Sequence, residues 1–263
     1  MKEEYFENPH IRILLVDDNR VNQFLGKRLL KNIGIENVDL CSNGTDALKK
    51  ISEVKYDVLL TDIEMPGMNG YELSKAVRAQ EQLKQLLIIA LTGNASDDDK
   101  AQALESGINV FITKPYSPED LLNVLKTHTS YTNPTASNAK QAEVKTAVIT
   151  HQGIQQIYSI FKNNADDVRH FLMMLSFQLP ELHKEIIAGI DTQNWEQVFQ
   201  STHKIKSPLK LFGDDELFEL LDQLSNDAKS NSDTDSFKTR MEKISSLLDK
   251  NLQLIHETLD GMI

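Results

Sequence analysis

The sequence predicts an α/β fold, a doubly wound five-stranded parallel sheet, followed by an all-α four-helix bundle. In residues 1–130, short runs that are apolar throughout alternate with amphipathic stretches, as in a parallel sheet that helices cover on both faces. In residues 148–263, apolar residues recur at helical spacing without any strand signal, which indicates amphipathic helices. Residues 131–147 are rich in Thr, Ser, Asn and Ala, and we expect them to form a linker.

The first region is predicted to contain five strands and five helices in alternation. The expected strands are residues 11–16, 37–41, 56–61, 86–92 and 110–113. The expected helices are residues 21–33, 46–51, 72–80, 97–106 and 118–127, with Gly34 and Gly107 following the first and the fourth. Because crossovers between parallel strands are right-handed, this alternation leads to a doubly wound sheet.

The second region carries four apolar stripes at helical spacing, in residues 168–186, 195–209, 217–224 and 237–255. Breaks between the stripes fall at residues 189–194, 213–215 and 230–235. Four amphipathic helices joined by short turns favour an antiparallel bundle. A short helix near residues 151–161 is expected to precede it.

The bulk composition narrows the possible classes of protein. The 263 residues carry a net charge of −11, which argues against direct binding of nucleic acid. Cys41 is the one cysteine, so no internal disulfide forms and a reducing cytoplasm fits. We expect no membrane segment and no signal peptide, because no apolar run approaches the roughly 18 residues of a membrane span.

Polar residues follow the predicted strands and suggest a site at one edge of the sheet. Asp17 and Asp18 follow the first strand, and Asp62 follows the third. Thr92 ends the fourth strand, and Lys114 follows the fifth. Ligands of doubly wound sheets bind at the carboxyl ends of the strands, where three carboxylates would suit Mg²⁺. Asp62 could then accept a phosphoryl group as a nucleophile, with Lys114 and Thr92 holding phosphate oxygens.

These segments resemble the signature of the two-component receiver domain over roughly residues 10–130. The matching motifs are Val16-Asp17-Asp18-Asn19, Asp62-Ile63-Glu64-Met65-Pro66-Gly67-Met68-Asn69-Gly70, Leu91-Thr92-Gly93 and Lys114-Pro115. The resemblance implies that Asp62 is phosphorylated. It also implies that Asp18, Asp62 and the Glu64 backbone carbonyl ligate Mg²⁺ directly, while Asp17 acts through water.

The resemblance implies further roles around the phosphorylation site. Lys114 would pair with the phosphate, and its peptide bond to Pro115 would be cis. Thr92 would move toward the phosphate as a switch, and Phe111 would rotate inward with it. The stretch Asn19-Arg20-Val21-Asn22-Gln23 resembles receivers that are attached to hybrid histidine kinases.

Among the seven histidines of the chain, His203 stands in a distinctive context. At 100° per residue, Lys206 and Lys210 lie within about 60° of it on the helix surface. We therefore expect an exposed imidazole flanked by two ammonium groups. Such an imidazole could accept a phosphoryl group, while the lysines stabilise its oxygens.

This segment resembles the motif of histidine phosphotransfer domains, and the resemblance covers about residues 148–263. The family motif has His, then Lys at +3, a small residue at +4 and Gly at +10. Here these positions are His203, Lys206, Ser207 and Gly213. The resemblance implies that His203 is phosphorylated.

Two residues depart from this motif. Lys210 stands where the family has a second small residue, and Pro208 follows at +5. Because proline removes a backbone hydrogen bond, we expect Pro208 to bend the helix.

Together these resemblances predict phosphorelay signalling through Asp62 and His203, without an ATP-binding kinase domain and therefore without enzyme activity of its own. The expected partners are a sensor histidine kinase, in trans or upstream in a longer parent chain, and a downstream receiver or response regulator. The expected location is the cytoplasm, with the chain free or as the cytoplasmic tail of a membrane sensor kinase. Two alternatives remain: a phosphorylation-gated interaction scaffold, and a Mg²⁺-dependent phosphohydrolase with an Asp nucleophile.

Overall fold

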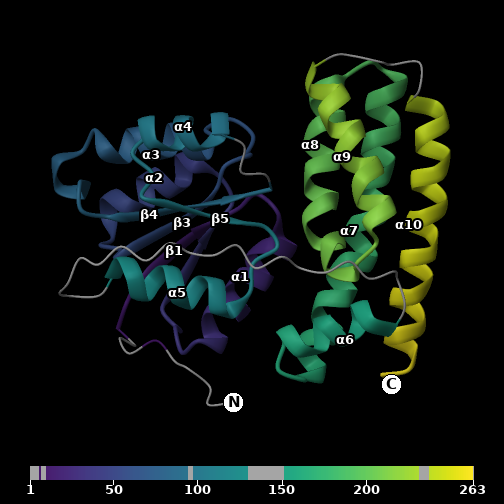
Figure 1. Cartoon of the computed structure of the whole chain (residues 1–263), viewed down its shortest axis with the longest axis horizontal. Helices are drawn as coiled ribbons and strands as arrows, with labels where there is room; N and C mark the ends of the chain where they lie inside the picture. Colours follow the sequence, from purple (N-terminus) through teal and green to yellow (C-terminus); the bar gives the residue numbers. More distant parts are fainter. Residues whose placement is uncertain (1–5, 7–9, 94–96, 130–150, 231–236, 263) are drawn as a thin grey trace. The chain divides into compact units, whose positions relative to one another are not determined.

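The computed structural model describes residue 6 and residues 10–93, 97–129, 151–230 and 237–262 of the chain. The chain divides into two compact units, Met1–Lys145 and Thr146–Ile263. The first unit combines a sheet with helices, and the described residues of the second unit form helices (Figure 1). The predicted linker, residues 131–147, lies outside the described residues, so its boundaries stay a prediction.

The first unit contains a five-stranded sheet in which all neighbouring strands are parallel. The strands are β1 (Ile13–Val16), β2 (Val38–Cys41), β3 (Val58–Asp62), β4 (Leu87–Thr92) and β5 (Val110–Thr113). Their order across the sheet is β2-β1-β3-β4-β5, the order of a doubly wound fold with its switch point between β1 and β3. The predicted fold class of this unit is therefore confirmed.

Helices cover both faces of the sheet. They are α1 (Arg20–Asn32), α2 (Gly44–Glu53), α3 (Gly70–Arg78), α4 (Asp97–Glu105) and α5 (Pro118–Thr129), with a 3₁₀ turn, η1 (Glu81–Leu83), before β4. Helices α1 and α5 contact each other on one face, while α2, α3 and α4 lie on the other (Figure 1). The side chains of Asn19, Asn43 and Asn69 accept backbone N–H groups at the starts of α1, α2 and α3, which fixes where these helices begin.

The three central strands, β1, β3 and β4, are mostly apolar because helices bury both of their faces, whereas the edge strands β2 and β5 are mostly half-buried. All four residues of β1 are buried, and alternate strand residues pack with α2 and α3 in one apolar cluster. In the strand register, Val16 lies opposite Thr61, and Asp62 lies opposite Leu91. The carboxyl ends of β1, β3 and β4 therefore reach the same edge of the sheet, where the polar residues after each strand meet.

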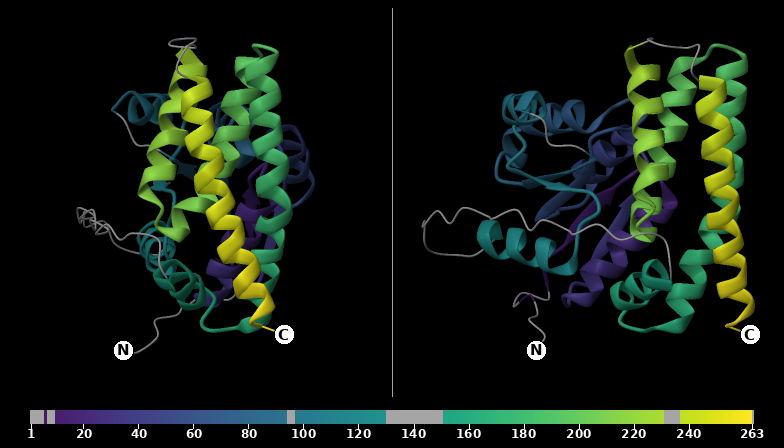
Figure 2. Two further views of the ribbon diagram at one scale, coloured as in Figure 1. Left: turned by 90° about the vertical axis from the view of Figure 1, so that its right-hand side faces the viewer. Right: turned by 45° about the vertical axis from the view of Figure 1, so that its right-hand side comes forward.

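The described residues of the second unit form four long helices and a shorter one. They are α6 (His151–Ile160), α7 (Ala165–Asp191), α8 (Trp195–Leu209), α9 (Asp215–Ser230) and α10 (Phe237–Asp260), with a 3₁₀ turn, η2 (Lys210–Phe212), after α8. Helix α7 contacts α8, α8 contacts α9, α9 contacts α10, and α10 contacts α7. The four long helices thus close a ring and run alongside one another in both views of Figure 2. This arrangement confirms the predicted four-helix bundle.

Most predicted apolar stripes form the core of the bundle. On α7 the fully or nearly fully buried residues are Val168, Phe171, Leu172, Leu175, Leu179, Leu182 and Ile186. Trp195 and Phe199, two residues of the predicted apolar stripe in residues 195–209, are only half-buried. A polar contact also lies inside the bundle: Asn251 Nδ2 donates to Asp214 Oδ2 at 2.9 Å, and it ties α10 to the start of α9.

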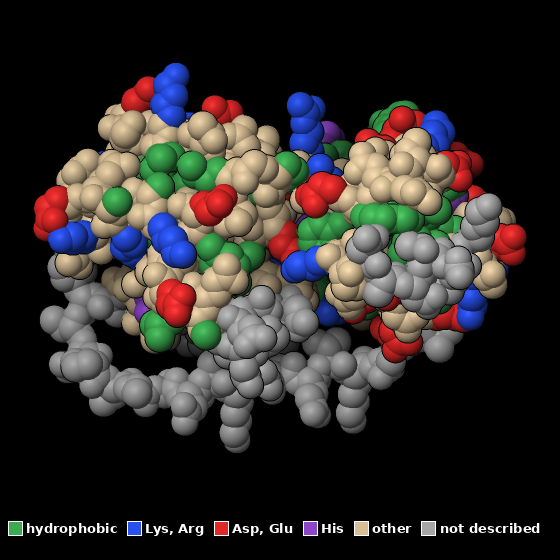
Figure 3. Space-filling view, turned by 90° about the horizontal axis from the view of Figure 1, so that it is seen from above, with side chains coloured by type: hydrophobic (Ala, Val, Ile, Leu, Met, Phe, Trp, Pro, Cys, Tyr) green, Lys and Arg blue, Asp and Glu red, His purple; other side chains and the backbone are tan. Residues whose placement is uncertain are grey.

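Charged side chains occur on both units rather than on one. On the face shown in Figure 3, lysine and arginine side chains are interspersed with aspartate and glutamate side chains on each unit. Among the described helices, none combines the length and the apolar character that crossing a bilayer requires.

Candidate functional site

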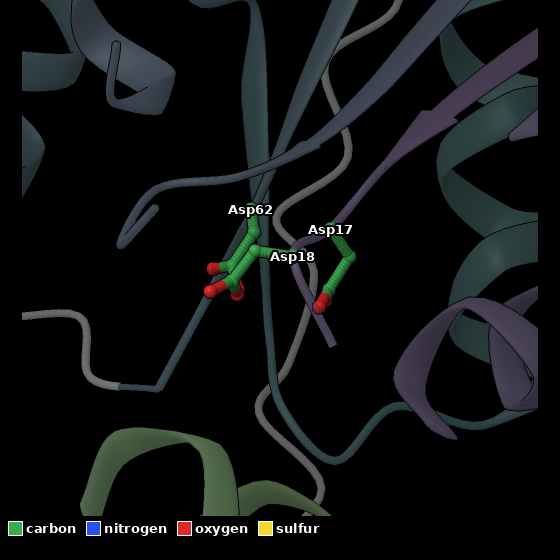
Figure 4. Close-up of side chains that lie close together, drawn as sticks. All are labelled: Asp17, Asp18 and Asp62. Carbon is green, nitrogen blue, oxygen red and sulfur yellow. The ribbon is translucent and has the colours of Figure 1, made fainter. Parts of the chain in front are cut away.

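Three aspartates come together at the carboxyl edge of the sheet. Asp17 and Asp18 follow β1, and Asp62 is the last residue of β3, as Figure 4 shows. One carboxylate oxygen from each residue lies within 4.8 Å of those of the other two. Asp17 and Asp62 are each 1% exposed. Because buried carboxylates repel one another, this cluster needs nearby positive charge to be stable.

Lys114, the residue after β5, supplies positive charge to two of these aspartates. Its Nζ atom lies 2.8 Å from Asp17 Oδ2 and 2.7 Å from Asp62 Oδ2. Burial disfavours the charged ammonium, but the two carboxylates outweigh this effect and raise the pKa of Lys114. Burial also raises the pKa of Asp17 to about 6, with Lys114 opposing the shift and Asp62 adding to it.

Two residues of α1 hold Asp17 in place, and our sequence reasoning assigned neither of them to the site. Asp17 Oδ1 accepts hydrogen bonds from Asn19 N at 2.9 Å and from Asn22 Nδ2 at 3.2 Å. Gln23 Nε2 donates to the Asp17 backbone oxygen at 2.7 Å. Both Asn22 and Gln23 belong to the stretch that resembles hybrid-kinase receivers, and this resemblance was the one feature of the sequence that could have pointed to them. Helix α1 begins at Arg20, three residues after Asp17, so the amides of its first turn are directed back toward this aspartate.

The other predicted residues of this site lie around the three aspartates. Glu64 is half-buried, and its backbone N–H donates to Asp62 Oδ1 at 3.3 Å. Thr92 ends β4, and its backbone oxygen accepts from Lys114 N at 2.7 Å. The peptide bond between Lys114 and Pro115 is cis, as expected. Phe111 on β5 is half-buried and packs against the apolar cluster shared by the sheet, α2 and α3; its switch role stays a prediction.

Gly70, the first residue of α3, packs directly on the end of β3. A Cβ atom at this position would collide with the Asp62 carbonyl oxygen and lie 2.9 Å from Ile63 Cα. These neighbours are backbone atoms, so they cannot move aside without displacing Asp62. We expect Gly70→Ala to lower the free energy of unfolding by about 2 kcal/mol, measured by urea denaturation. The control is Gly93→Ala, because a Cβ at Gly93 meets no atom within 4 Å; equal losses in both variants would contradict this prediction.

His203 lies on α8 in the helical unit, and the prediction that its imidazole is exposed is wrong. The side chain is 6% exposed, and its ring centroid lies 6.4 Å from that of Phe199. Helix α8 packs against both α7 and α9. Its buried surface is therefore wider than the single apolar stripe in the sequence, and it takes in Ser201, Thr202 and His203.

The two lysines near His203 are directed toward α9. Lys206 Nζ lies 2.6 Å from Asp222 Oδ1. Lys210 Nζ lies 4.8 Å from the centroid of the Phe218 ring. The sequence did not indicate Asp222 or Phe218 as parts of this site, because both come from a neighbouring helix and no spacing within α8 reveals them.

The remaining motif positions lie at the end of α8. Ser207 is half-buried, and Pro208 is buried in the last turn. Helix α8 includes Pro208 and ends at Leu209, where the 3₁₀ turn η2 begins; Pro208 thus lies at a helix end, not in the middle of a helix. Gly213 follows η2 with φ of 69°, a left-handed conformation that favours glycine.

Comparison with known proteins identifies the first unit. Residues 13–126 match the family model of the response regulator receiver domain. The chemotaxis protein CheY of Pseudomonas aeruginosa is 37% identical over 111 residues, which cover 42% of this chain and 90% of that protein. The chain belongs to the response regulator receiver family. Receiver domains are signalling modules of two-component phosphorelays, not kinases, and they work with histidine kinases or phosphotransfer proteins.

This chain is also similar to longer proteins, over more than the receiver domain. The sensor protein EvgS of Escherichia coli K12 is 32% identical over 207 residues, covering 76% of this chain and 16% of EvgS. The alignment is longer than the 145 residues of the first unit, so the similarity extends into the helical unit.

Among solved structures, the chain is similar to the receiver domain of the sensor histidine kinase PA1611 from Pseudomonas aeruginosa, which has magnesium in its active-site cleft. The two are 35% identical, with a TM-score of 0.42, and the match covers 45% of this chain and 96% of that chain.

Proposed function

We propose that the chain relays phosphoryl groups, accepting them on Asp62 in the receiver domain and transferring them through His203 in the helical unit. The observation that carries the first half is the buried cluster of Asp17, Asp18 and Asp62 with Lys114 bonded to two of its members. A nucleophilic carboxylate beside a fixed cation is the arrangement that phosphoryl acceptance requires.

Phosphoryl transfer to Asp62 exchanges one bond to phosphorus for another. A carboxylate oxygen of Asp62 attacks phosphorus, a new P–O bond forms, and the bond from phosphorus to the donor nitrogen or oxygen breaks. The donor leaves with the electron pair. Lys114 Nζ, now 2.7 Å from Asp62 Oδ2, can stay beside the same carboxyl and neutralise an oxygen of the transferred group. The Thr92 hydroxyl, at the end of the neighbouring strand, is the proposed second partner.

The residues of the pocket fit a divalent cation. Three carboxylate oxygens within 4.8 Å of one another form the hard oxygen donor set that Mg²⁺ prefers. We propose that Asp18, Asp62 and the Glu64 carbonyl ligate Mg²⁺, and that Asp17 contributes through water. The cation would supply positive charge that offsets the repulsion among carboxylates and phosphoryl oxygens.

The helical unit is proposed to act as a histidine phosphotransfer domain. Its four-helix bundle, the motif from His203 to Gly213, and the EvgS alignment that extends beyond the receiver support this role. A lone pair on an imidazole nitrogen attacks phosphorus, the P–N bond forms, and the Asp carboxylate leaves with its electrons; the proton stays on the other ring nitrogen. Because His203 is buried, its side chain must turn outward when a receiver docks.

We propose the same organisation that the sequence suggested: receiver domain in residues 1–130, linker in 131–147 and phosphotransfer domain in 148–263. The chain covers 16% of the EvgS length, so a sensor kinase upstream in a longer parent is a proposed source of phosphoryl groups, alongside a kinase in trans. A downstream receiver is the proposed acceptor. The proposed location is the cytoplasm, where sensor kinases bind ATP.

Intact-protein mass spectrometry tests this function. The protein is incubated with Mg²⁺ and acetyl phosphate, and adducts are sorted by acid and alkali treatment. We expect an alkali-labile acyl phosphate on Asp62 and an acid-labile phosphohistidine on His203. His203→Gln should retain the first adduct and lose the second; His183→Gln, on α7, is the control and should retain both. An acid-labile adduct that is stable to alkali and survives His203→Gln would contradict the proposed relay residue, and turnover of a phosphomonoester would favour a phosphohydrolase.

A further inference from the structure

An ion pair links Lys206, one helical turn after His203, to a carboxylate on the neighbouring helix. Lys206 Nζ on α8 lies 2.6 Å from Asp222 Oδ1 on α9, and the two side chains are 15% and 46% exposed. Asn226 Nδ2 donates to the other carboxylate oxygen, Asp222 Oδ2, at 3.2 Å. Both oxygens of Asp222 are therefore held, one by the ammonium and the other by the amide.

The pair lies beside the proposed phosphorylation site. Residues three apart on a helix are surface neighbours, with Cβ atoms about 5–6 Å apart, so Lys206 can reach a group attached to His203. The ammonium is also partly enclosed, since its Nζ atom lies 5.8 Å from the centroid of the Phe218 ring. While Asp222 holds it, its charge is largely cancelled toward an incoming phosphoryl group.

A second lysine belongs to the same charged group. Lys210 Nζ lies 4.8 Å from the centroid of the same Phe218 ring. Burial and the nearby Lys206 ammonium lower the pKa of Lys210, while Asp215 and Asp222 act in the other direction. Asp222 therefore offsets positive charge on both ammonium groups, and its removal would leave Lys206 without its ion-pair partner while Asp215 still acts on Lys210.

We infer that Asp222 is a positioning residue that restrains Lys206 until a phosphoryl group on or near His203 displaces it. This inference rests on the proposed phosphotransfer role of the helical unit. A lysine that exchanges Asp222 for the phosphoryl group suits a relay. Because Asp222 competes for Lys206, it keeps the phosphohistidine from becoming too stable to pass its phosphoryl group on. Asp222 is about half exposed to solvent, so the lysine can exchange this carboxylate for another anion at low cost.

The test uses the full chain carrying Asp62→Asn, so that the receiver accepts nothing, with phosphoramidate as the donor. The P–N bond of phosphoramidate breaks, ammonia leaves, and the acid-labile adduct on His203 is followed by intact mass. Asp222→Asn should raise the initial rate about fivefold, the factor that corresponds to about 1 kcal/mol for a partly exposed pair. Asp222→Glu, which keeps the charge, should return the rate toward that of the parent.

A double-mutant cycle separates a role through Lys206 from a structural one. In a Lys206→Ala background, Asp222→Asn should no longer change the rate. Asp227→Asn is the matched control, because Asp227 lies on α9 like Asp222 and forms a comparable cross-helix ion pair with Arg240 of α10; it should leave the rate unchanged. An unchanged or lower rate in Asp222→Asn, or an equal gain in the Lys206→Ala background, overturns the inference. Absence of any acid-labile adduct in the parent chain instead overturns the proposed role of His203.

Discussion

In an Asp62→Asn variant we expect no alkali-labile adduct to form with Mg²⁺ and acetyl phosphate, even after long incubation. The asparagine amide has nearly the same size as the carboxylate, but it is neutral and a poor nucleophile toward phosphorus. It also removes one charge from the pocket that Lys114 contacts at 2.7 Å. Because the variant loses both the nucleophile and a proposed metal ligand, we expect phosphorylation of this site to be abolished, not merely slowed.

The matched control is Asp57→Asn, one residue before β3, where the structure places an exposed carboxylate. Asp57 Oδ2 accepts a hydrogen bond from Arg12 N at 2.8 Å, and an asparagine oxygen can accept the same bond. Asp57→Asn should therefore acquire the adduct as the unaltered protein does. Circular dichroism should show both variants folded. An adduct that forms at a normal rate in Asp62→Asn would mean that another carboxylate is the acceptor.

The acidic pocket could be predicted from the sequence because its residues follow directly from strand order. Once Asp17 and Asp62 are seen at the ends of two buried strands, a parallel sheet must bring them to the same edge. Lys114 follows by the same argument from the fifth strand. No knowledge of side-chain packing is needed, and the observed bonds of Lys114 to both aspartates agree with the expectation.

The histidine site could be predicted only in part, because it depends on packing between helices. Helical spacing locates His203, Lys206 and Lys210 on one side of α8, but it does not say which helix covers that side. In the structure His203 is buried, and Lys206 pairs with Asp222 of α9. Lys206 and Asp222 are 16 residues apart, and the segment between them includes a turn whose geometry the sequence pattern does not specify.

The amides around Asp17 illustrate a similar limit within the receiver domain. In the sequence, Asn22 and Gln23 lie in the first turn of a predicted amphipathic helix, where polar residues are expected to be exposed on the helix surface. In the structure they are 6% and 7% exposed, because the first turn of α1 lies against the end of β1. Short side chains near helix starts often bond backward to the preceding loop, but the sequence does not show which atoms they reach.

Replacement of Lys114 by methionine is expected to destabilise the receiver domain strongly in the absence of divalent cations. Lys114 is 4% exposed and bonded to two carboxylates that are each 1% exposed. Removing one member of a buried ion pair leaves uncompensated charge and costs about 3–5 kcal/mol. Methionine keeps the length and the apolar stem of lysine, so the loss should reflect charge more than packing. Thermal denaturation followed by circular dichroism, with and without chelator, measures it.

Added Mg²⁺ should reverse much of this loss, because a cation that binds the folded pocket stabilises it by mass action. With the lysine gone, the three carboxylates present more negative charge, so Lys114→Met should need less Mg²⁺ for half-maximal stabilisation than the unaltered protein. The matched control is Lys84→Met, at an exposed lysine whose partner Glu81 lies on the same turn; it should change neither stability nor response to Mg²⁺. If Lys114→Met loses stability but Mg²⁺ restores none of it, the carboxylates do not form the proposed metal site, and Lys114 then serves the fold alone.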